Sequence, residues 1–329
     1  MAIRYGYACI NITLRKDKIT TNRGMIRRTF DAKGLPYVSE IVIKNITDQL
    51  KIVQWNIENG INLYRMSGSL FPWMSEYEFT ELPEYDTIKS ILAKTGKLAM
   101  DNGQRLSFHP GQFCVLCSPT PKTVDNAIIE LDRHSQIMDM MGLPISPAAK
   151  INIHVGGAYG DKESALKRWC ENFKRLEPNT QKRLVVENDD KASMYSVKDL
   201  YEGVHKVVGC PITFDYHHHK FCTGGLSEEE ALKLAASTWP KDIRPCTHYS
   251  ESRRIEQKKI VEDICKESDI SIEDIHDWPT LSKYYTDYSK TKEQAHSDYI
   301  TQEPNCYGLD IDCVVEAKAK EQSIINYIN

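Results

Sequence analysis

The stretch RLVVENDDKASMYSVKDLYEGVHKVVGCPITFD, residues 183–215, contains two short apolar runs that each end in a carboxylate. Runs rich in Val, Ile, Leu and Phe are typical of parallel strands that helices cover on both faces. The segment between them, residues 196–208, has a helical pattern and begins at a serine that can cap a first turn. The stretch therefore predicts a strand–helix–strand unit with Glu187 and Asp215 at the ends of its strands.

Four more apolar runs end in a residue that can bind a metal ion. They are RLSFH, ending at His109, INIH at His154, RPCTH at His248 and DCVVE at Glu316. Residues 3–10 and 61–66 form two further strand-like runs, which brings the number of expected strands to eight. If the strands run parallel, all of these end residues lie at one rim of the sheet.

Segments with helical patterns separate the expected strands. They span residues 41–59, 85–100, 123–141, 162–176, 196–208 and 227–237. Strands and helices that alternate along a whole chain argue for one parallel sheet. Eight such units favour closure into a TIM, or (β/α)8, barrel, which needs about 250 residues plus insertions. The ring of His, Asp and Glu then predicts a metal site at the mouth of the barrel.

The spacing of the ligand-ended strands supports one barrel with an insertion. Successive ligands are 45, 33, 28, 33 and 68 residues apart, whereas one unit takes about 30 residues. The excess in the last interval falls in a charged segment at about 252–291, which we interpret as an insertion in the seventh βα loop. We expect residues 1–329 to form a single domain that carries this insertion.

Composition limits the classes of function. The chain has 329 residues and a net charge of −4, so no overall basic field points to nucleic acid. Bound divalent cations would nevertheless reverse the charge of an acidic cleft. Ten scattered cysteines, without a secretory segment before them, indicate a reduced, intracellular protein. No run approaches the roughly 20 apolar residues of a membrane span, so we expect a soluble protein.

The residue types of the predicted site indicate which ions it would hold. A mixture of histidine and carboxylate without paired thiolates suits Mn²⁺, Zn²⁺ or Mg²⁺. The cluster FDYHHHK lets one loop bind two ions through Asp215 and His218. The one Cys-x-x-Cys pair, Cys114 and Cys117, lacks the second pair of a zinc ribbon, so we interpret both thiols as small apolar side chains.

The motif HPGQF, residues 109–113, predicts exposed side chains beside the metal site. Pro110 and Gly111 force a turn directly after the ligand and push Gln112 and Phe113 outward. An exposed amide next to an aromatic ring suits an unstacked base. A phenylalanine folded back under the loop is the alternative.

A basic loop follows the first expected strand. Its charged residues are Arg15, Lys16, Lys18, Arg23, Arg27 and Arg28. The loop lies at the same end of the barrel as the ligands, so it could hold phosphates. A solvated surface without a function is the alternative.

A series of motifs resembles, in the same order, the UV damage endonuclease (UVDE) family. The motifs are GYACIN, TTNR, LFPW, LSFHPGQF, HVGGAYGDK, VENDD, FDYHHH, THYSES and VVEAKAKEQ, and they run from Gly6 to about Gln322. The resemblance implies a TIM barrel with two or three divalent metal ions, usually manganese. It implies an enzyme that nicks double-stranded DNA immediately 5′ to cyclobutane dimers, 6-4 photoproducts and some other lesions, without ATP. We expect the protein to be a monomer.

The resemblance also assigns residues. The implied metal ligands are His109, His154, Glu187, Asp215, His218, His248, His296 and Glu316. Of these, Glu187, Asp215, His248 and Glu316 would hold the catalytic ions. The implied DNA contacts are Gln112 and Phe113, which fill the gap beneath flipped bases, and Tyr7 and Asn11 near the lesion, to which we add Arg23 from the basic loop.

Two positions depart from the family pattern. Ser69 stands where a bacterial member has a metal-binding histidine, and Cys246 stands where that member has a carboxylated lysine. We therefore expect no carboxylated lysine, and one ion that is bound more weakly or differently.

The predicted chemistry is metal-assisted phosphodiester hydrolysis. Two enzymes with related barrels are alternatives: an endonuclease IV-like abasic-site nuclease and a xylose-isomerase-like sugar isomerase. A DNA-damage sensor without activity is a third alternative, if Ser69 and Cys246 have disabled the metal cluster.

Overall fold

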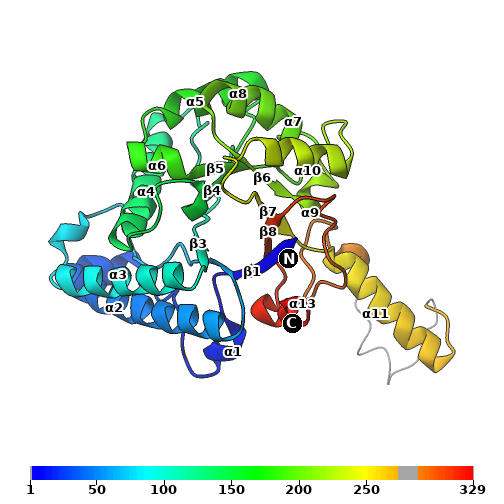
Figure 1. The fold of residues 1–329 in the computed structure, drawn as a ribbon, viewed down its shortest axis with the longest axis horizontal. Helices are drawn as coiled ribbons and strands as arrows, with labels where there is room; N and C mark the ends of the chain where they lie inside the picture. The colour runs from blue at the N-terminus through cyan, green and yellow to red at the C-terminus, as the bar shows by residue number, and fades with distance from the viewer. Residues whose placement is uncertain (1, 273–287, 329) are drawn as a thin grey trace.

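A computed structural model describes residues 2–272 and 288–328. Eight strands form its centre and helices surround them (Figure 1). The strands are β1 (Ile3–Ala8), β2 (Leu63–Arg65), β3 (Arg105–Ser107), β4 (Ile151–His154), β5 (Leu184–Glu187), β6 (Ile212–Asp215), β7 (Cys246–Tyr249) and β8 (Ile311–Val315). Each overlaps a strand that the sequence predicts.

The strands close into a barrel. Their order is β3-β2-β1-β8-β7-β6-β5-β4, and every paired neighbour is parallel. The two outer strands meet through a parallel bridge between Phe108 and Ile151. There, Phe108 N donates to Lys150 O at 2.9 Å, and Asn152 N donates to Phe108 O at 2.9 Å. The prediction of a TIM barrel is confirmed.

Helices cover the outside of the barrel. The longer ones are α2 (Arg27–Glu58), α3 (Tyr85–Asp101), α4 (Pro121–Met140), α5 (Lys162–Phe173), α10 (Glu228–Ser237) and α11 (Arg253–Ser268). The short ones are α1 (Ile12–Arg15), α6 (Pro178–Arg183), α7 (Val197–Leu200), α8 (Lys206–Val208), α9 (Tyr216–His219) and α13 (Ile325–Ile328). Five expected helices lie where the sequence predicts them, and Ser227 caps α10 as expected.

Helix α2 begins earlier than the sequence predicts. It starts at Arg27, whereas the apolar pattern begins near residue 41. Its backbone breaks at Gly34, where φ is 60°, and Pro36 follows the break. The buried face of the helix starts only at Val38, so the turns before the kink carry no periodic apolar signal.

The interior of the barrel is held together by buried charges. Asp312 in β8 is 0% exposed and accepts two hydrogen bonds of 2.7 Å from the Arg4 guanidinium and one of 2.8 Å from Arg105 Nη1. Two other strands separate β3 from β8, so the contact with Arg105 crosses the inside of the barrel. Buried ions of this kind require such complete pairing.

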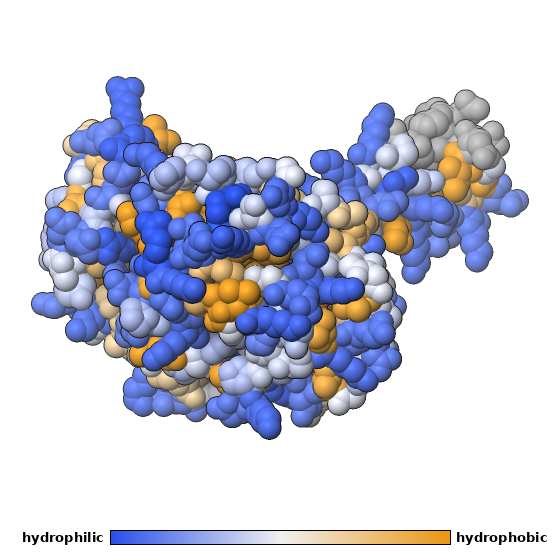
Figure 2. Space-filling model, turned by 90° about the horizontal axis from the view of Figure 1, so that it is seen from above, coloured by the Kyte–Doolittle hydropathy of each residue, from blue (hydrophilic) through white to orange (hydrophobic). Residues whose placement is uncertain are grey.

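Helix α11 stands away from the barrel as a separate lobe (Figures 1 and 2). Its Val261 and Cys265 pack on Ile270, Ile272 and Tyr288, apart from the barrel core. Ser252, directly before α11, bridges His296 in antiparallel fashion, so both ends of this segment return to the barrel. The rest of the expected insertion, residues 273–287, lies outside the described residues. Among the described residues, no helix is long and apolar enough to cross a membrane.

Gly6 provides a test of the packing of the barrel. A Cβ atom at Gly6 would lie 2.2 Å from the backbone oxygen of Leu63 in the neighbouring strand. Because that backbone is fixed by strand pairing, we expect Gly6→Ala to lower the free energy of unfolding by about 3 kcal/mol. Denaturant unfolding measures the change. Gly24→Ala is the control, since a Cβ there has no neighbour within 4 Å, and equal stability of the two variants would contradict the prediction.

Candidate metal centre

The parallel register sets predicted ligands side by side at the barrel mouth. His154 at the end of β4 pairs with Glu187 at the end of β5. Asp215 at the end of β6 pairs with His248 in β7. Residues paired in a parallel sheet present their side chains on the same face. The two pairs therefore bring four predicted ligands to one rim.

The Glu187 carboxylate is the centre of the cluster. It is 1% exposed. Its Oε2 lies 3.4 Å from His109 Nε2 and 3.1 Å from His248 Nδ1. Its Oε1 lies 3.5 Å from His218 Nδ1 and 3.9 Å from His154 Nε2. Four of the five histidines predicted as ligands thus surround one buried carboxylate.

Two groups of three side chains have the geometry of a metal site. His109 and His154 form one group with Glu187, and Asp215 and His248 form the other with the same Glu187. In each group, the ligand atoms lie within 4.8 Å of one another. Because Glu187 belongs to both groups, it could serve as a ligand in either of them.

Glu316 extends the cluster on the β8 side. Its Oε1 lies 3.2 Å from His248 Nδ1, and its Oε2 lies 3.6 Å from His296 Nδ1. The bridge between His296 and Ser252 delivers His296 to this place from the end of the α11 segment. All eight ligands that the sequence predicts are therefore brought together in one cluster.

Oxygen atoms behind the cluster lie close to two of the histidine rings. His109 Nδ1 lies 3.0 Å from the carbonyl oxygen of Pro110, and His154 Nδ1 lies 3.1 Å from Asp189 Oδ1. A carbonyl oxygen can only accept, so Nδ1 of His109 is the donor and the lone pair of its Nε2 faces Glu187, as in a metal-binding histidine. At His154 the Asp189 carboxylate lies close to Nδ1, which makes no hydrogen bond of good geometry.

Unsatisfied buried atoms indicate that the cluster fits cations. Asp215 Oδ2 and His248 Nδ1 are buried, and neither makes a hydrogen bond of good geometry. Buried polar atoms without a partner are rare in proteins. A metal ion would satisfy both atoms, and the mixture of histidine and carboxylate suits a divalent ion.

The pKa values of the cluster reflect its dense charge. Burial raises the pKa of Asp215 to about 6, and the nearby Glu187 and Glu316 carboxylates add to the rise. Burial would lower the pKa of His154, but the Glu187 and Asp189 carboxylates outweigh it and raise this pKa to about 10. Since a metal binds neutral imidazole, an ion at His154 would displace a proton.

Two cationic side chains at the cluster were not predicted from the sequence. Arg65, the last residue of β2, pairs with Glu316. Lys150, just before β4, places its Nζ 3.0 Å from His248 Nε2 and 3.1 Å from Asn152 Oδ1 inside the barrel. Arg65 lies in the expected strand at residues 61–66, and Lys150 directly precedes the expected strand at residues 151–154. A pattern of metal ligands at strand ends does not reveal either cation.

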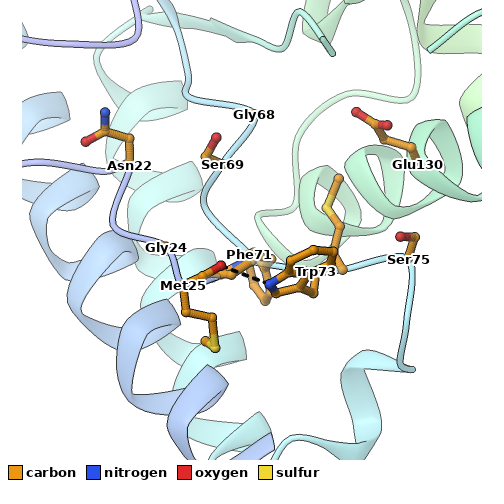
Figure 3. A pocket seen from close by; sticks show the side chains of 11 residues that line it. Asn22, Gly24, Met25, Gly68, Ser69, Phe71, Trp73, Ser75 and Glu130 are labelled. Atoms are coloured by element: carbon orange, nitrogen blue, oxygen red, sulfur yellow. Dashed lines mark hydrogen bonds between the residues drawn. The ribbon is translucent and has the colours of Figure 1, made fainter. Parts of the chain in front are cut away.

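The two departures from the family pattern lie in different surroundings. Ser69 follows β2 and lines a pocket of about 350 Å³ together with Asn22 and Glu130 (Figure 3). It belongs to neither ligand group of the described residues. Cys246 is buried at the start of β7, and a different lysine, Lys150, approaches His248.

The HPGQF turn exposes its aromatic ring. Phe113 is 81% exposed, so its side chain does not fold back under the loop. Gln112 is exposed beside it. Phe113 follows His109 by four positions, and an extended chain of that length spans at most about 14 Å. The Cα atom of Phe113 therefore lies within that distance of the Cα atom of His109.

The other predicted DNA contacts are engaged within the protein. Tyr7 is 0% exposed, and its hydroxyl donates to Asn56 Oδ1 at 2.8 Å and accepts from Asn11 Nδ2 at 3.0 Å. Asn11 also caps α1 through Leu14 N. The Arg23 guanidinium pairs with Asp48 at 2.6 Å. Contact of Tyr7, Asn11 and Arg23 with DNA stays a prediction.

Comparison with known protein sequences places this chain among UV endonucleases. The family model "UV-endonuclease UvdE" matches residues 3–329. A protein of Acanthamoeba polyphaga mimivirus is 29% identical over 98% of this chain and 89% of its own length. The UV-damage endonuclease of Schizosaccharomyces pombe is 33% identical over 98% of this chain and 49% of its own length. This chain thus spans most of the viral relative and about half of the yeast one.

Solved structures agree with this relationship. The crystal structure of SacUVDE matches with a TM-score of 0.78 and 29% identity, over 99% of this chain and 96% of that one. Endonuclease IV from Thermus thermophilus matches with a TM-score of 0.53 and 9% identity, over 98% and 95% of the chains, which shows a shared fold alone. The chain therefore belongs to the UV-endonuclease UvdE family, whose members are enzymes that act on DNA.

Proposed function

We propose that this chain nicks double-stranded DNA immediately 5′ to UV photoproducts, both cyclobutane dimers and 6-4 photoproducts, with the help of two or three divalent ions, manganese foremost. The observation that carries the proposal is the position of Glu187, which two ligand groups share at the barrel mouth. The names of the yeast and Bacillus cereus relatives, which are UV-damage endonucleases, supply the class of substrate.

Each part of the cluster has a role in this proposal. Glu187, Asp215, His248 and Glu316 would hold the catalytic ions, and the remaining histidines would complete their coordination. Such ions lower the pKa of a bound water and neutralise charge at a scissile phosphate. Pro110 O would keep the His109 ring oriented, and Asp189 lies close to the His154 ring. Lys150 Nζ holds the far side of the His248 ring.

Gln112 and Phe113 would supply lesion recognition. A damaged step is less costly to unstack than a normal one, so a protein can select it through deformability. The exposed Phe113 ring beside an amide would fill the gap that flipped bases leave. An abasic-site nuclease would not need to fill a gap of two bases, which favours photoproducts over the endonuclease IV-like alternative.

Monomeric state and an intracellular location remain predictions. All ten cysteines are free thiols, as expected of a protein in a reducing compartment.

Replacement of the shared carboxylate tests the metal centre. We expect Glu187→Gln to reduce nicking of UV-irradiated duplex DNA more than 100-fold, since even residues behind metal ligands contribute about 10- to 100-fold. DNA binding should be largely kept, because Glu187 is buried. Gel assays measure nicking and binding. The control is Glu171→Gln on the exposed face of α5, and nicking by Glu187→Gln at the wild-type rate would refute the assignment.

Metal removal gives a second test that does not depend on activity. The metal-free protein should unfold at a lower temperature than the protein with Mn²⁺, because a ligand that binds only the folded state stabilises it by about 2.7 kcal/mol at a concentration 100 times its Kd. Thermal unfolding with chelator, Mn²⁺ or Mg²⁺ measures the shift. Glu187→Gln should lose the shift, and an equal shift in this variant would argue for ions bound elsewhere.

The exposed phenylalanine tests lesion recognition. We expect Phe113→Ala to lower kcat/KM on a duplex with one cyclobutane dimer by roughly 10-fold or more, since stacking on a base contributes about 1–3 kcal/mol. Stability should not change, because the ring is exposed. Val207→Ala in α8, which is 56% exposed, is the control. Unchanged kcat/KM in Phe113→Ala would remove the ring from the mechanism.

A further inference from the structure

Arg65 reaches the metal cluster with most of its hydrogen-bonding capacity unused. Its side chain is only 14% exposed and pairs with Glu316. Its Nε is buried without a hydrogen-bond partner. A guanidinium has five N–H donors, which match the oxygens of carboxylates and phosphates in pairs. Within the described part of the chain, Glu316 is the sole carboxylate that pairs with Arg65.

Glu316 has room for both Arg65 and an ion. Its Oε1 faces Arg65 and His248, and its Oε2 faces His296 Nδ1 at 3.6 Å. Coordination of an ion at the His296 side would therefore not require Arg65 to leave. The guanidinium would then lie beside the metal cluster with free donors.

Lys320, four residues after Glu316, has an unfavourable backbone conformation. Its φ is 54°, in the left-handed region that residues other than glycine rarely adopt. The chain is fixed on both sides of it. Ala319 N donates to Asp298 O at 2.9 Å, and the Glu321 carboxylate accepts from Ile12 N at 2.9 Å and Thr13 N at 2.7 Å. Such strain persists where the surroundings impose it, often at functional sites.

The Lys320 ammonium group has no acceptor in this position. Across the described residues, no carboxylate lies within ion-pair distance of its Nζ, although the side chain is half-buried. The nearby carboxylates are engaged, Glu321 with the amides of α1 and Glu316 with Arg65. Burial lowers the pKa of Lys320 and the positive charge of Arg65 lowers it further, whereas Cys9 and the Glu316 and Glu321 carboxylates act in the opposite direction. Two neighbouring cations, one of them unpaired, would be stabilised by an anion.

We propose that Arg65 and Lys320 together form a site for one phosphate of the DNA backbone, next to Glu316 at the mouth of the barrel. The proposal rests on the proposed endonuclease function, since it names how the substrate strand is held beside the metal centre. Arg65 supplies paired N–H donors, and Lys320 supplies a point charge. The fixed backbone at Lys320 would hold its half-buried side chain in place for this contact.

Salt dependence of DNA binding tests this site without catalysis. The dissociation constant for an undamaged duplex is measured in chelator at several salt concentrations. Each phosphate contact contributes about 0.9 to the slope of log K against log salt. Lys320→Gln should therefore lower the slope by about one and weaken binding roughly eight-fold at 0.1 M salt.

Two other variants separate a phosphate contact from effects on folding or general charge. Lys318→Gln removes an exposed lysine two residues away and should change the slope much less. Lys320→Gly removes the charge but adopts a φ of 54° without strain, so it should unfold at or above the wild-type temperature and still bind DNA weakly. An unchanged slope in Lys320→Gln, or equal losses in Lys320→Gln and Lys318→Gln, would overturn the proposal.

The role of Arg65 is tested through kinetics. Arg65→Lys keeps a positive charge on Glu316 but loses the paired donors, so KM for dimer-containing DNA with Mn²⁺ should rise. A KM equal to that of the wild type would exclude Arg65 from the phosphate site. Wild-type protein that binds DNA through Lys320 but does not nick dimers would contradict the proposed function and leave the phosphate site standing.

Discussion

The buried Glu187 carboxylate is the contact around which the rest of the site is arranged. It stands at the end of β5, and histidines from β4, β7, α9 and the turn after β3 converge on its two oxygens. No single strand could collect these groups, because they come from segments more than 100 residues apart. Closure of the parallel barrel brings these groups together, so the candidate metal site depends on the fold as a whole.

Buried charged side chains inside the barrel accompany the cluster around Glu187. Asp312 is paired with Arg4 and Arg105 at the opposite end, and Lys150 contacts His248 midway. A core of this kind is polar where most barrels are filled with branched apolar side chains. The cationic groups offset the carboxylates of the metal centre, so the protein can keep a dense acidic cluster buried before any cation binds.

The strands and the ligands could be predicted from the sequence because both leave a local signal. An apolar run that ends in His, Asp or Glu is visible without knowing the fold, and all six such ends lie in the cluster. Arg65, Lys150 and Lys320 were missed, since their roles depend on contacts across the barrel and on a backbone angle. The burial of Tyr7 was equally hidden, because an alternating strand does not reveal which face meets α2. His296 came from the family motifs and not from a strand pattern.

The central claim is our proposal that Glu187 is a ligand in two ion sites at the mouth of the barrel. Anomalous X-ray diffraction at the manganese edge, from crystals grown with Mn²⁺, measures this directly. We expect at least two peaks, one beside His109 and His154 and one beside Asp215 and His248, with Glu187 touching both. An absence of peaks in the cluster, or a single ion that does not touch Glu187, would contradict this claim.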